Sequence, residues 1–232
     1  MDSEKATCAD CGAEFASKAV GFEGVIMFRQ RYCATCMTKS EEREKASKTR
    51  SVLSERAAEW TRICPASYQG TDIEHSGISD ICRRAAKAWN PESVRGLAFI
   101  GVTGLGKTRS LFWVLQRAHD AGRSCAAISH NRFSRVVADA FAGDGDERAR
   151  GKALLRKLAR VDVLLFDDLG KAPSTERADA ECEELVEVRT SNGLPMLWTS
   201  NGSGAWLAKR FGEDRGEPIT RRLGEFCRVI TV

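Results

Sequence analysis

The stretch Gly101-Val-Thr-Gly104-Leu-Gly106-Lys107-Thr108 decides the fold of this 232-residue chain, because it matches the pattern GxxxxGKT. The apolar run 96–100 before it predicts a buried strand, and the run 109–118 after it predicts a helix. Glycines let backbone N–H groups surround phosphate oxygens at such a helix N-terminus, while the lysine reaches the β- and γ-phosphates and the threonine hydroxyl ligates Mg²⁺. The alternative is a chance glycine-rich turn, and the flanking strand and helix argue against it.

Two further apolar runs are each followed by polar residues that suit the binding of phosphate and Mg²⁺. The run 161–166 is typical of a parallel strand buried on both faces, and Asp167 and Asp168 follow it. We expect Asp167 to hold Mg²⁺ through water and Asp168 to polarise the attacking water. The run 195–200 is followed by Asn201, which is expected to orient that water beside the γ-phosphate, although Thr-Ser-Asn alone is a turn signal.

These motifs define the expected nucleotide site. Its binding residues are Gly101, Thr103, Gly104, Leu105, Gly106, Lys107, Thr108, Arg109 and Asp167. Among them, Thr108 and Asp167 are the expected magnesium ligands. Lys107, Asp168 and Asn201 are the residues from these three motifs that we expect to take part in catalysis.

A fourth motif, Ile219-Thr-Arg-Arg-Leu-Gly224, lies near the end of the chain. Together with GVTGLGKT, LLFDDLG and WTSN, in that order, it resembles the AAA+ ATPases, and most closely the DnaC/DnaI/IstB group of helicase loaders and transposition helpers. The resemblance covers roughly residues 63–232. It implies that Arg222 is a catalytic arginine finger acting on ATP held by a neighbouring subunit, with Arg221 as the second choice. Ordinary surface salt bridges are the alternative for both arginines.

The resemblance also implies the fold class. We expect an α/β P-loop NTPase with an AAA+ core, in which helices cover both faces of a parallel sheet, and without a C-terminal lid because the sequence ends soon after Arg222. A small zinc module is expected to precede the core. The pair Asp167-Asp168 replaces the Asp-Glu of many AAA+ proteins, and this shorter second carboxylate leaves open how fast the protein hydrolyses ATP.

The zinc module is predicted by two CxxC pairs, Cys8/Cys11 and Cys33/Cys36. Four thiolates on two tight turns form a closed tetrahedral set, so the Zn²⁺ is expected to be structural. Disulfides are the first alternative, and the lack of a signal peptide argues against them by indicating a reducing cytoplasm. A redox CxxC is the weaker alternative, since nothing around it suggests a βαβ unit.

Composition sets outer limits on the function. The chain is 42% hydrophobic and 29% charged, with a net charge of +4, and no apolar run is long enough to span a membrane. Six basic residues nevertheless crowd one segment with a helical stripe of leucines, and they are Arg148, Arg150, Lys152, Arg156, Lys157 and Arg160. A solvated helix face is the simpler explanation, and contact with a phosphate backbone is the functional one.

Three domains are expected, namely a zinc module at 1–38, a helical linker at 39–66 and the AAA+ domain at 67–232. Strand and helix patterns alternate through the third, which favours a parallel α/β sheet. The expected elements after the phosphate loop are 107–120, 124–129, 131–141, 151–160, 161–167, 176–190, 195–200, 204–211 and 227–232, with Gly143-Asp-Gly-Asp146 as a loop.

The resemblance therefore implies a cytoplasmic helicase loader that uses ATP, Mg²⁺ and Zn²⁺. Its expected partners are a replicative DnaB-type helicase, single-stranded DNA and further copies of itself in an ATP-dependent oligomer, with no membrane involved. An IstB-like transposition helper is the main alternative. A regulatory module that binds ATP but scarcely hydrolyses it is the third, and Asp168 in place of glutamate keeps it open.

Overall fold

The computed structural model describes residues 3–22 and 25–232 as two compact units, Met1–Glu59 and Trp60–Val232. The division falls inside helix α1 (Ala34–Ile63), which contains most of the segment 39–66 that the sequence indicated as a linker. Within the described ranges, no helix combines the length and the apolar character that crossing a membrane requires.

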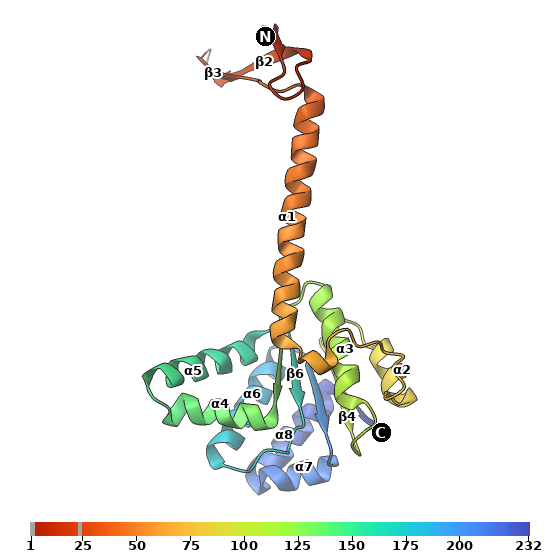
Figure 1. Cartoon of the computed structure of the whole chain (residues 1–232). Coiled ribbons are helices and arrows are strands. Elements are labelled where there is room, and N and C mark those ends of the chain that lie inside the picture. The colour runs from red at the N-terminus through yellow and green to blue at the C-terminus, as the bar shows by residue number, and fades with distance from the viewer. Residues whose placement is uncertain (1–2, 23–24) are drawn as a thin grey trace. The chain divides into compact units, whose positions relative to one another are not determined.

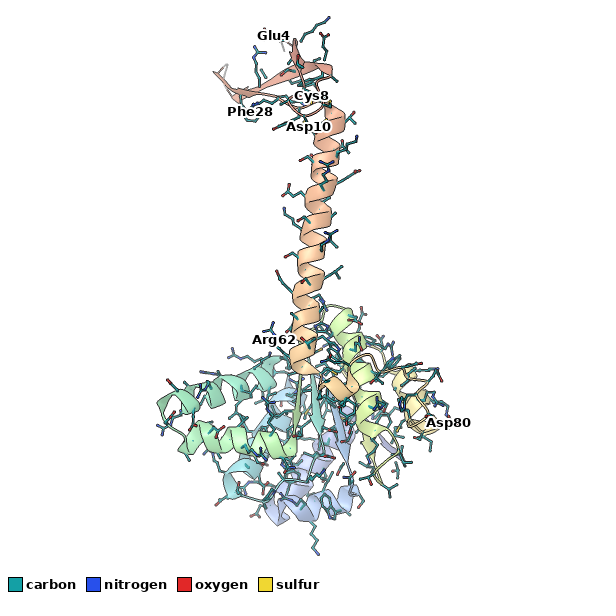
Figure 2. The ribbon with its side chains drawn as sticks, in the orientation of Figure 1. Glu4, Cys8, Asp10, Phe28, Arg62 and Asp80 are labelled. Atoms are coloured by element: carbon teal, nitrogen blue, oxygen red, sulfur yellow. The ribbon has the colours of Figure 1, made fainter. Side chains whose placement is uncertain are left out.

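The N-terminal unit contains a small antiparallel sheet. Its strands β1 (Ser3–Thr7), β2 (Glu14–Phe22) and β3 (Val25–Arg29) lie in that order, and the latter two are labelled in Figure 1. The strands β2 and β3 pair antiparallel in the segment between the two cysteine pairs, and residues 23 and 24 lie outside the described part. The middle of α1 is solvated, since the described side chains at 37–55 are all exposed (Figure 2).

The second unit is built on a five-stranded sheet. Its strand order is β5 (Cys125–Ser129), β6 (Val163–Asp167), β7 (Met196–Ser200), β4 (Gly96–Ile100) and β8 (Cys227–Thr231). Every neighbouring pair is parallel, which confirms the predicted parallel sheet. The order places β4 between β7 and β8, so the phosphate loop after β4 lies near the ends of β6 and β7.

Helices cover both faces of this sheet (Figure 1). They are α2 (Asp80–Ala88), α3 (Lys107–Asp120), α4 (His130–Ala142), α5 (Gly145–Arg160), α6 (Glu176–Ser191), α7 (Gly204–Phe211) and α8 (Glu213–Phe226). Alternate residues of each strand supply two buried clusters. Leu165 packs with α2 and α3, whereas Leu164 and Phe166 pack with α4, α6 and α8.

Two local predictions need correction. The segment 143–146 is not wholly a loop, because α5 already begins at Gly145. Asp144 caps that helix by accepting a hydrogen bond from the Glu147 amide at 2.9 Å, and the Glu147 side chain completes a capping box. Helix α8 was not predicted, because its glycines and Pro218 obscure any helical pattern. Burial of Ile219 and Leu223 in the core stabilises it instead.

Candidate functional site

The phosphate loop connects β4 to α3 and depends on glycine at its close contacts. Gly106, the N-cap of α3, has φ of 75°, and a Cβ there would lie 2.5 Å from the carbonyl oxygen of Gly77. Gly101 has φ of 137°, and its Cβ would lie 1.9 Å from the Val232 oxygen. Residues other than glycine are strained at such positive φ values. The loop can therefore bring its backbone N–H groups close to a bound anion.

Lys107 is the first residue of α3 and is buried, with 6% of its surface exposed. Its ammonium donates to the carbonyl oxygens of Gly101 and Val102 at 2.8 and 2.6 Å and to the Asn201 side-chain oxygen at 3.1 Å. Burial lowers the pKa of Lys107, while the nearby Asp168 carboxylate opposes that shift. The structure thus brings Lys107 and Asn201 together inside the loop.

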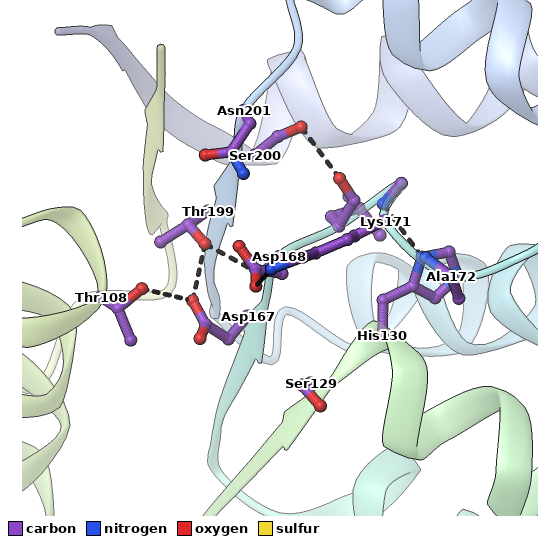
Figure 3. Close-up of polar contacts among 12 residues, drawn as sticks. Thr108, Ser129, His130, Asp167, Asp168, Lys171, Ala172, Thr199, Ser200 and Asn201 are labelled. Carbon is purple, nitrogen blue, oxygen red and sulfur yellow. Dashed lines mark hydrogen bonds and ion pairs between the residues drawn. The ribbon is translucent and has the colours of Figure 1, made fainter. Parts of the chain in front are cut away.

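Asp167 ends β6 and lies opposite Thr108. The Thr108 hydroxyl donates to Asp167 Oδ1 at 2.8 Å, and the Thr199 hydroxyl donates to the same oxygen at 2.6 Å (Figure 3). Burial raises the pKa of Asp167, and the hydrogen bonds from Thr199 and Thr108 oppose that shift. A hydroxyl beside a carboxylate offers oxygen ligands of the kind that suit Mg²⁺.

Asp168 follows in an unusual backbone conformation, with φ of 55°, and it is the sole described non-glycine residue at positive φ. Its amide donates to the Thr199 hydroxyl at 2.9 Å, and its carboxylate accepts from the Lys171 ammonium at 2.8 Å. Positive φ in a residue with a side chain is costly and often marks a functional position. The carboxylate is 28% exposed, so water has access to it.

The structure does not bring the two candidate arginines to this loop. Arg221 on α8 is exposed, and Arg222 pairs with Glu187 of α6 at 3.3 Å. The Glu187 side chain is 49% exposed, so this ion pair is weak. Within one chain, Arg222 therefore has a partner other than the nucleotide loop.

The four N-terminal cysteines form the second candidate site. Their sulfur atoms all lie within 4.8 Å of one another. The distance from Cys11 Sγ to Cys33 Sγ is 3.7 Å, close to the edge of about 3.8 Å that a tetrahedron with zinc–sulfur bonds of about 2.3 Å requires. No disulfide links them, since all four are free cysteines. The donor set therefore fits one tetrahedral metal ion.

The backbone around Cys8 is arranged for a thiolate. Cys8 Sγ accepts from the Cys33 amide at 3.3 Å, and Gly12, with φ of 73°, donates to the Cys8 carbonyl at 3.0 Å. Backbone N–H groups, chiefly that of Cys11 and then that of Cys33, lower the pKa of Cys8 to about 6. Such tight turns with N–H groups directed at sulfur stabilise metal-binding thiolates.

The basic segment forms an exposed face on α5. All six of its basic residues are exposed, while Leu158 is buried in the core. Helices α4 and α5 pack tightly, because Gly151 lies where a Cβ would be 2.7 Å from the Ala140 nitrogen. Lys157 also lines a cavity of about 570 Å³, which includes Arg132 on α4 and reaches Asp167. Positive charge thus extends from the α4–α5 pair toward the nucleotide site.

Sequence reasoning missed several residues that organise the site. Thr199 links the two carboxylate positions, and its place at the end of a strand within Trp-Thr-Ser-Asn was the available signal. Lys171 pairs with Asp168, and nothing in the motif indicated that contact. His130 is fully buried, and its Nδ1 accepts from the amides of Gly170 and Ala172 at 3.0 and 3.3 Å. It therefore holds the loop after Asp168.

Comparisons with known proteins agree with this geometry. No known family profile matches the chain. The putative insertion sequence ATP-binding protein y4pL of Sinorhizobium fredii is 29% identical over 111 residues, covering 47% of this chain and 43% of that protein. The solved structure of the DnaC helicase loader gives a TM-score of 0.58 at 17% identity, covering 72% of this chain and 99% of that one. The chain has the AAA+ fold.

A structure of the replication initiator DnaA bound to AMPPCP and single-stranded DNA shares this AAA+ fold. Its TM-score is 0.53 at 15% identity, over 72% of this chain and 50% of the DnaA chain. These comparisons confirm the P-loop fold class and the resemblance to DnaC and to insertion-sequence ATP-binding proteins that the motifs indicated. Identities this low establish the fold alone, and the match to y4pL spans less than half of that protein.

Proposed function

We propose that this AAA+ protein is an ATP-dependent helicase loader of the DnaC type. It would bind ATP, self-associate, hold single-stranded DNA and deliver a replicative DnaB-type helicase in the cytoplasm. The observation that carries the ATP-dependent part is the convergence of Lys107, Asp167 and Asn201 on one glycine-rich loop. The similarity to the DnaC helicase loader and to DnaA bound to AMPPCP and single-stranded DNA supports the remainder.

Lys107 is the residue that would recognise the nucleotide. Its buried ammonium now donates to two loop carbonyls and to Asn201. The β- and γ-phosphates of ATP would replace neutral acceptors by anionic ones, and charge-assisted hydrogen bonds are about twice as strong. Thr108 and Asp167 would hold Mg²⁺, which would neutralise charge on the phosphates when bound.

Asp168 is the proposed polarising carboxylate for the attacking water, and Asn201 would orient that water. Arg222 would be supplied by the neighbouring subunit, which requires its exposed pair with Glu187 to open. Mixing inactive Lys107→Ala and Arg222→Ala proteins tests this directly, because some mixed interfaces would combine an intact loop with an intact arginine. Recovered turnover supports a shared site, and no recovery in verified mixed oligomers places Arg222 in a structural role.

The cysteine cluster would hold one Zn²⁺ in a closed, structural site. Its four sulfurs leave no position for water, so the metal would support folding rather than chemistry. The N-terminal unit that it supports is the proposed surface for recruiting the helicase. The exposed basic face of α5 is the proposed contact for the phosphate backbone of single-stranded DNA.

A transposition helper is the second candidate, and one observation favours it. The matching curated relative is described as a putative insertion sequence ATP-binding protein, and its identity over the matched region exceeds that of the DnaC structure. In that case the DNA would be duplex and the partner a transposase. The ATP chemistry proposed above would be the same.

Helicase loading can be assayed with the full-length protein, a circular single strand and the replicative helicase of the source organism. ATP should increase the helicase bound to DNA, and Lys107→Ala should abolish that increase. The contrary outcome is a protein that binds duplex DNA in preference to single strands and recovers a transposase but no helicase. That outcome would identify transposition, and not helicase loading, as the function.

A further inference from the structure

The carboxylate of Asp168 is already engaged by a cation from its own loop. Lys171 Nζ lies 2.8 Å from Asp168 Oδ2, and the Lys171 amide donates to the Asp168 carbonyl oxygen at 3.0 Å (Figure 3). The two residues thus close a tight turn directly after β6. The ion pair raises the pKa of Lys171, chiefly through the hydrogen bond to Asp168. Lys171 is therefore charged near neutral pH.

The loop that presents Lys171 is fixed from two sides. His130 at the start of α4 accepts from the amides on both sides of Lys171, those of Gly170 and Ala172. Arg210 on α7 donates to the carbonyl oxygens of the same two residues, to that of Gly170 at 3.1 Å. These contacts satisfy the loop's polar backbone groups and hold the base of the Lys171 side chain in place.

Packing restricts this loop as well. Gly170 has φ of 91°, and a Cβ at that position would lie 2.5 Å from the Trp206 ring. The hydroxyl of Ser200 donates to the Leu169 carbonyl oxygen at 2.9 Å. By contrast, the Lys171 side chain itself is 56% exposed, so it is free to leave the carboxylate without disturbing the fold. A fixed backbone with a releasable ammonium gives a contact that can be broken at low cost.

We infer that Lys171 is a positioning residue that restrains ATP hydrolysis by occupying the carboxylate of Asp168. The inference rests on the proposed role of Asp168 as the residue that polarises water. An ammonium on one carboxylate oxygen occupies a lone pair that the attacking water would use, so that oxygen cannot accept the hydrogen bond that orients and polarises the water. Release of Lys171 is then one condition for full turnover.

The test compares turnover at saturating ATP and Mg²⁺ for wild type, Lys171→Met, Lys171→Arg and Asp168→Asn. An exposed pair is worth up to about 1 kcal/mol, so Lys171→Met should raise kcat by about two- to fivefold, with ATP affinity unchanged. Lys171→Arg keeps the charge and should retain the slow rate. Lys209→Met removes an exposed lysine from α7 and is the matched control, which should behave as wild type.

Salt gives a second measurement that a purely structural role would not affect. Added KCl should raise wild-type kcat toward that of Lys171→Met and leave the variant nearly constant, because salt screens an exposed pair. A fall in kcat for Lys171→Met, or no change, overturns the inference while Asp168→Asn remains inactive. If Asp168→Asn itself hydrolyses ATP at the wild-type rate, the proposed role of Asp168 fails, and this inference fails with it.

Discussion

The two compact units bury very different residues. In the N-terminal unit, the buried residues among those whose exposure is described are Cys8, Ser17 and Cys36, so two of the three belong to the sulfur cluster. The second unit instead buries large apolar side chains on both faces of its sheet, Phe99 and Phe166 among them. A small unit with so little buried apolar surface needs another source of folding energy.

The units also differ in where they keep their polar groups. In the first, the buried polar atoms are chiefly the metal donors themselves. In the second, fully buried polar side chains such as Arg189 and His130 bond to backbone groups and hold the ends of strands and helices in place. The first unit should therefore depend on one ion, and the second on apolar packing together with a few buried polar side chains that bond to the backbone.

Removing the metal should have the largest effect. Apparent binding energies of structural zinc reach about 10–16 kcal/mol, which exceeds the stability of a unit this small. Cys36→Ser, or a strong chelator, should unfold the N-terminal unit, seen as loss of protease protection at 3–59, while ATP binding persists. Metal analysis should find one zinc per chain. Disulfides among these four cysteines, without zinc, would contradict the account.

Arg189→Met should cause the next largest loss, confined to the second unit. The buried guanidinium donates to the carbonyl oxygens of Leu158, Val161 and Pro195 at 2.8 to 3.0 Å, which the variant would leave unsatisfied. We expect unfolding in urea to show a loss of at least about 3 kcal/mol. Arg177→Met on the same helix removes a partly exposed pair with Glu181 and the stacking of Arg177 on the Phe141 ring, and should cost about 1 kcal/mol. Equal losses would refute the role of Arg189.

Acid should weaken the second unit through His130. Burial, followed by the charge of Arg210, lowers the pKa of His130 from 6.5 to about 4. The unfolded chain therefore binds the proton first, and stability falls as pH drops from about 6.5 toward 4, by up to about 3 kcal/mol. His130→Asn keeps an acceptor for the loop amides and removes the titration. Its stability should be lower overall but flatter with pH, and an unchanged slope would exclude His130 as the cause.

Charge reversal on α5 should have the smallest free-energy effect. Arg156→Glu with Lys157→Glu should weaken binding of single-stranded DNA and flatten its salt dependence, with a slope change of about 0.7 for each phosphate that the helix no longer neutralises. Arg84→Glu on α2 also reverses an exposed arginine and is the control. Wild-type affinity and slope in the double variant would make this face of α5 a solvated surface alone.

Much of the second unit was predictable, because its strands are short apolar runs followed by residues suited to binding phosphate, Mg²⁺ or water. The phosphate loop, the strand before Asp167 and the strand before Asn201 were all identified in this way. Helix α8 was not, because Gly216 and Pro218 oppose helix formation locally. Tertiary packing explains this helix. Gly216 lies directly against α7, where a Cβ would be 1.8 Å from the Ala208 carbonyl oxygen.

The sequence predicted which residues form the site better than it predicted the contacts between them. The motifs gave Lys107, Thr108 and Asp167, and the structure places them together. The pairing of Lys171 with Asp168 depends on a tight turn at positive φ, and no periodicity or spacing signals that geometry. The catalytic assignments of Asp168, Asn201 and Arg222 remain proposals that turnover measurements must decide.

The proposed ATP chemistry depends above all on Lys107 and Asp168, so ATP binding and hydrolysis by Lys107→Ala and Asp168→Asn are the decisive measurement. Both should be measured on the full chain with Mg²⁺ and a fluorescent ATP analogue. Lys107→Ala should lose tight binding, because the charge facing the phosphates is gone. Asp168→Asn should bind ATP as wild type does and lose at least about a hundredfold in kcat, because the water is no longer polarised. Wild-type turnover in Asp168→Asn, or undiminished binding in Lys107→Ala, would contradict the proposed function.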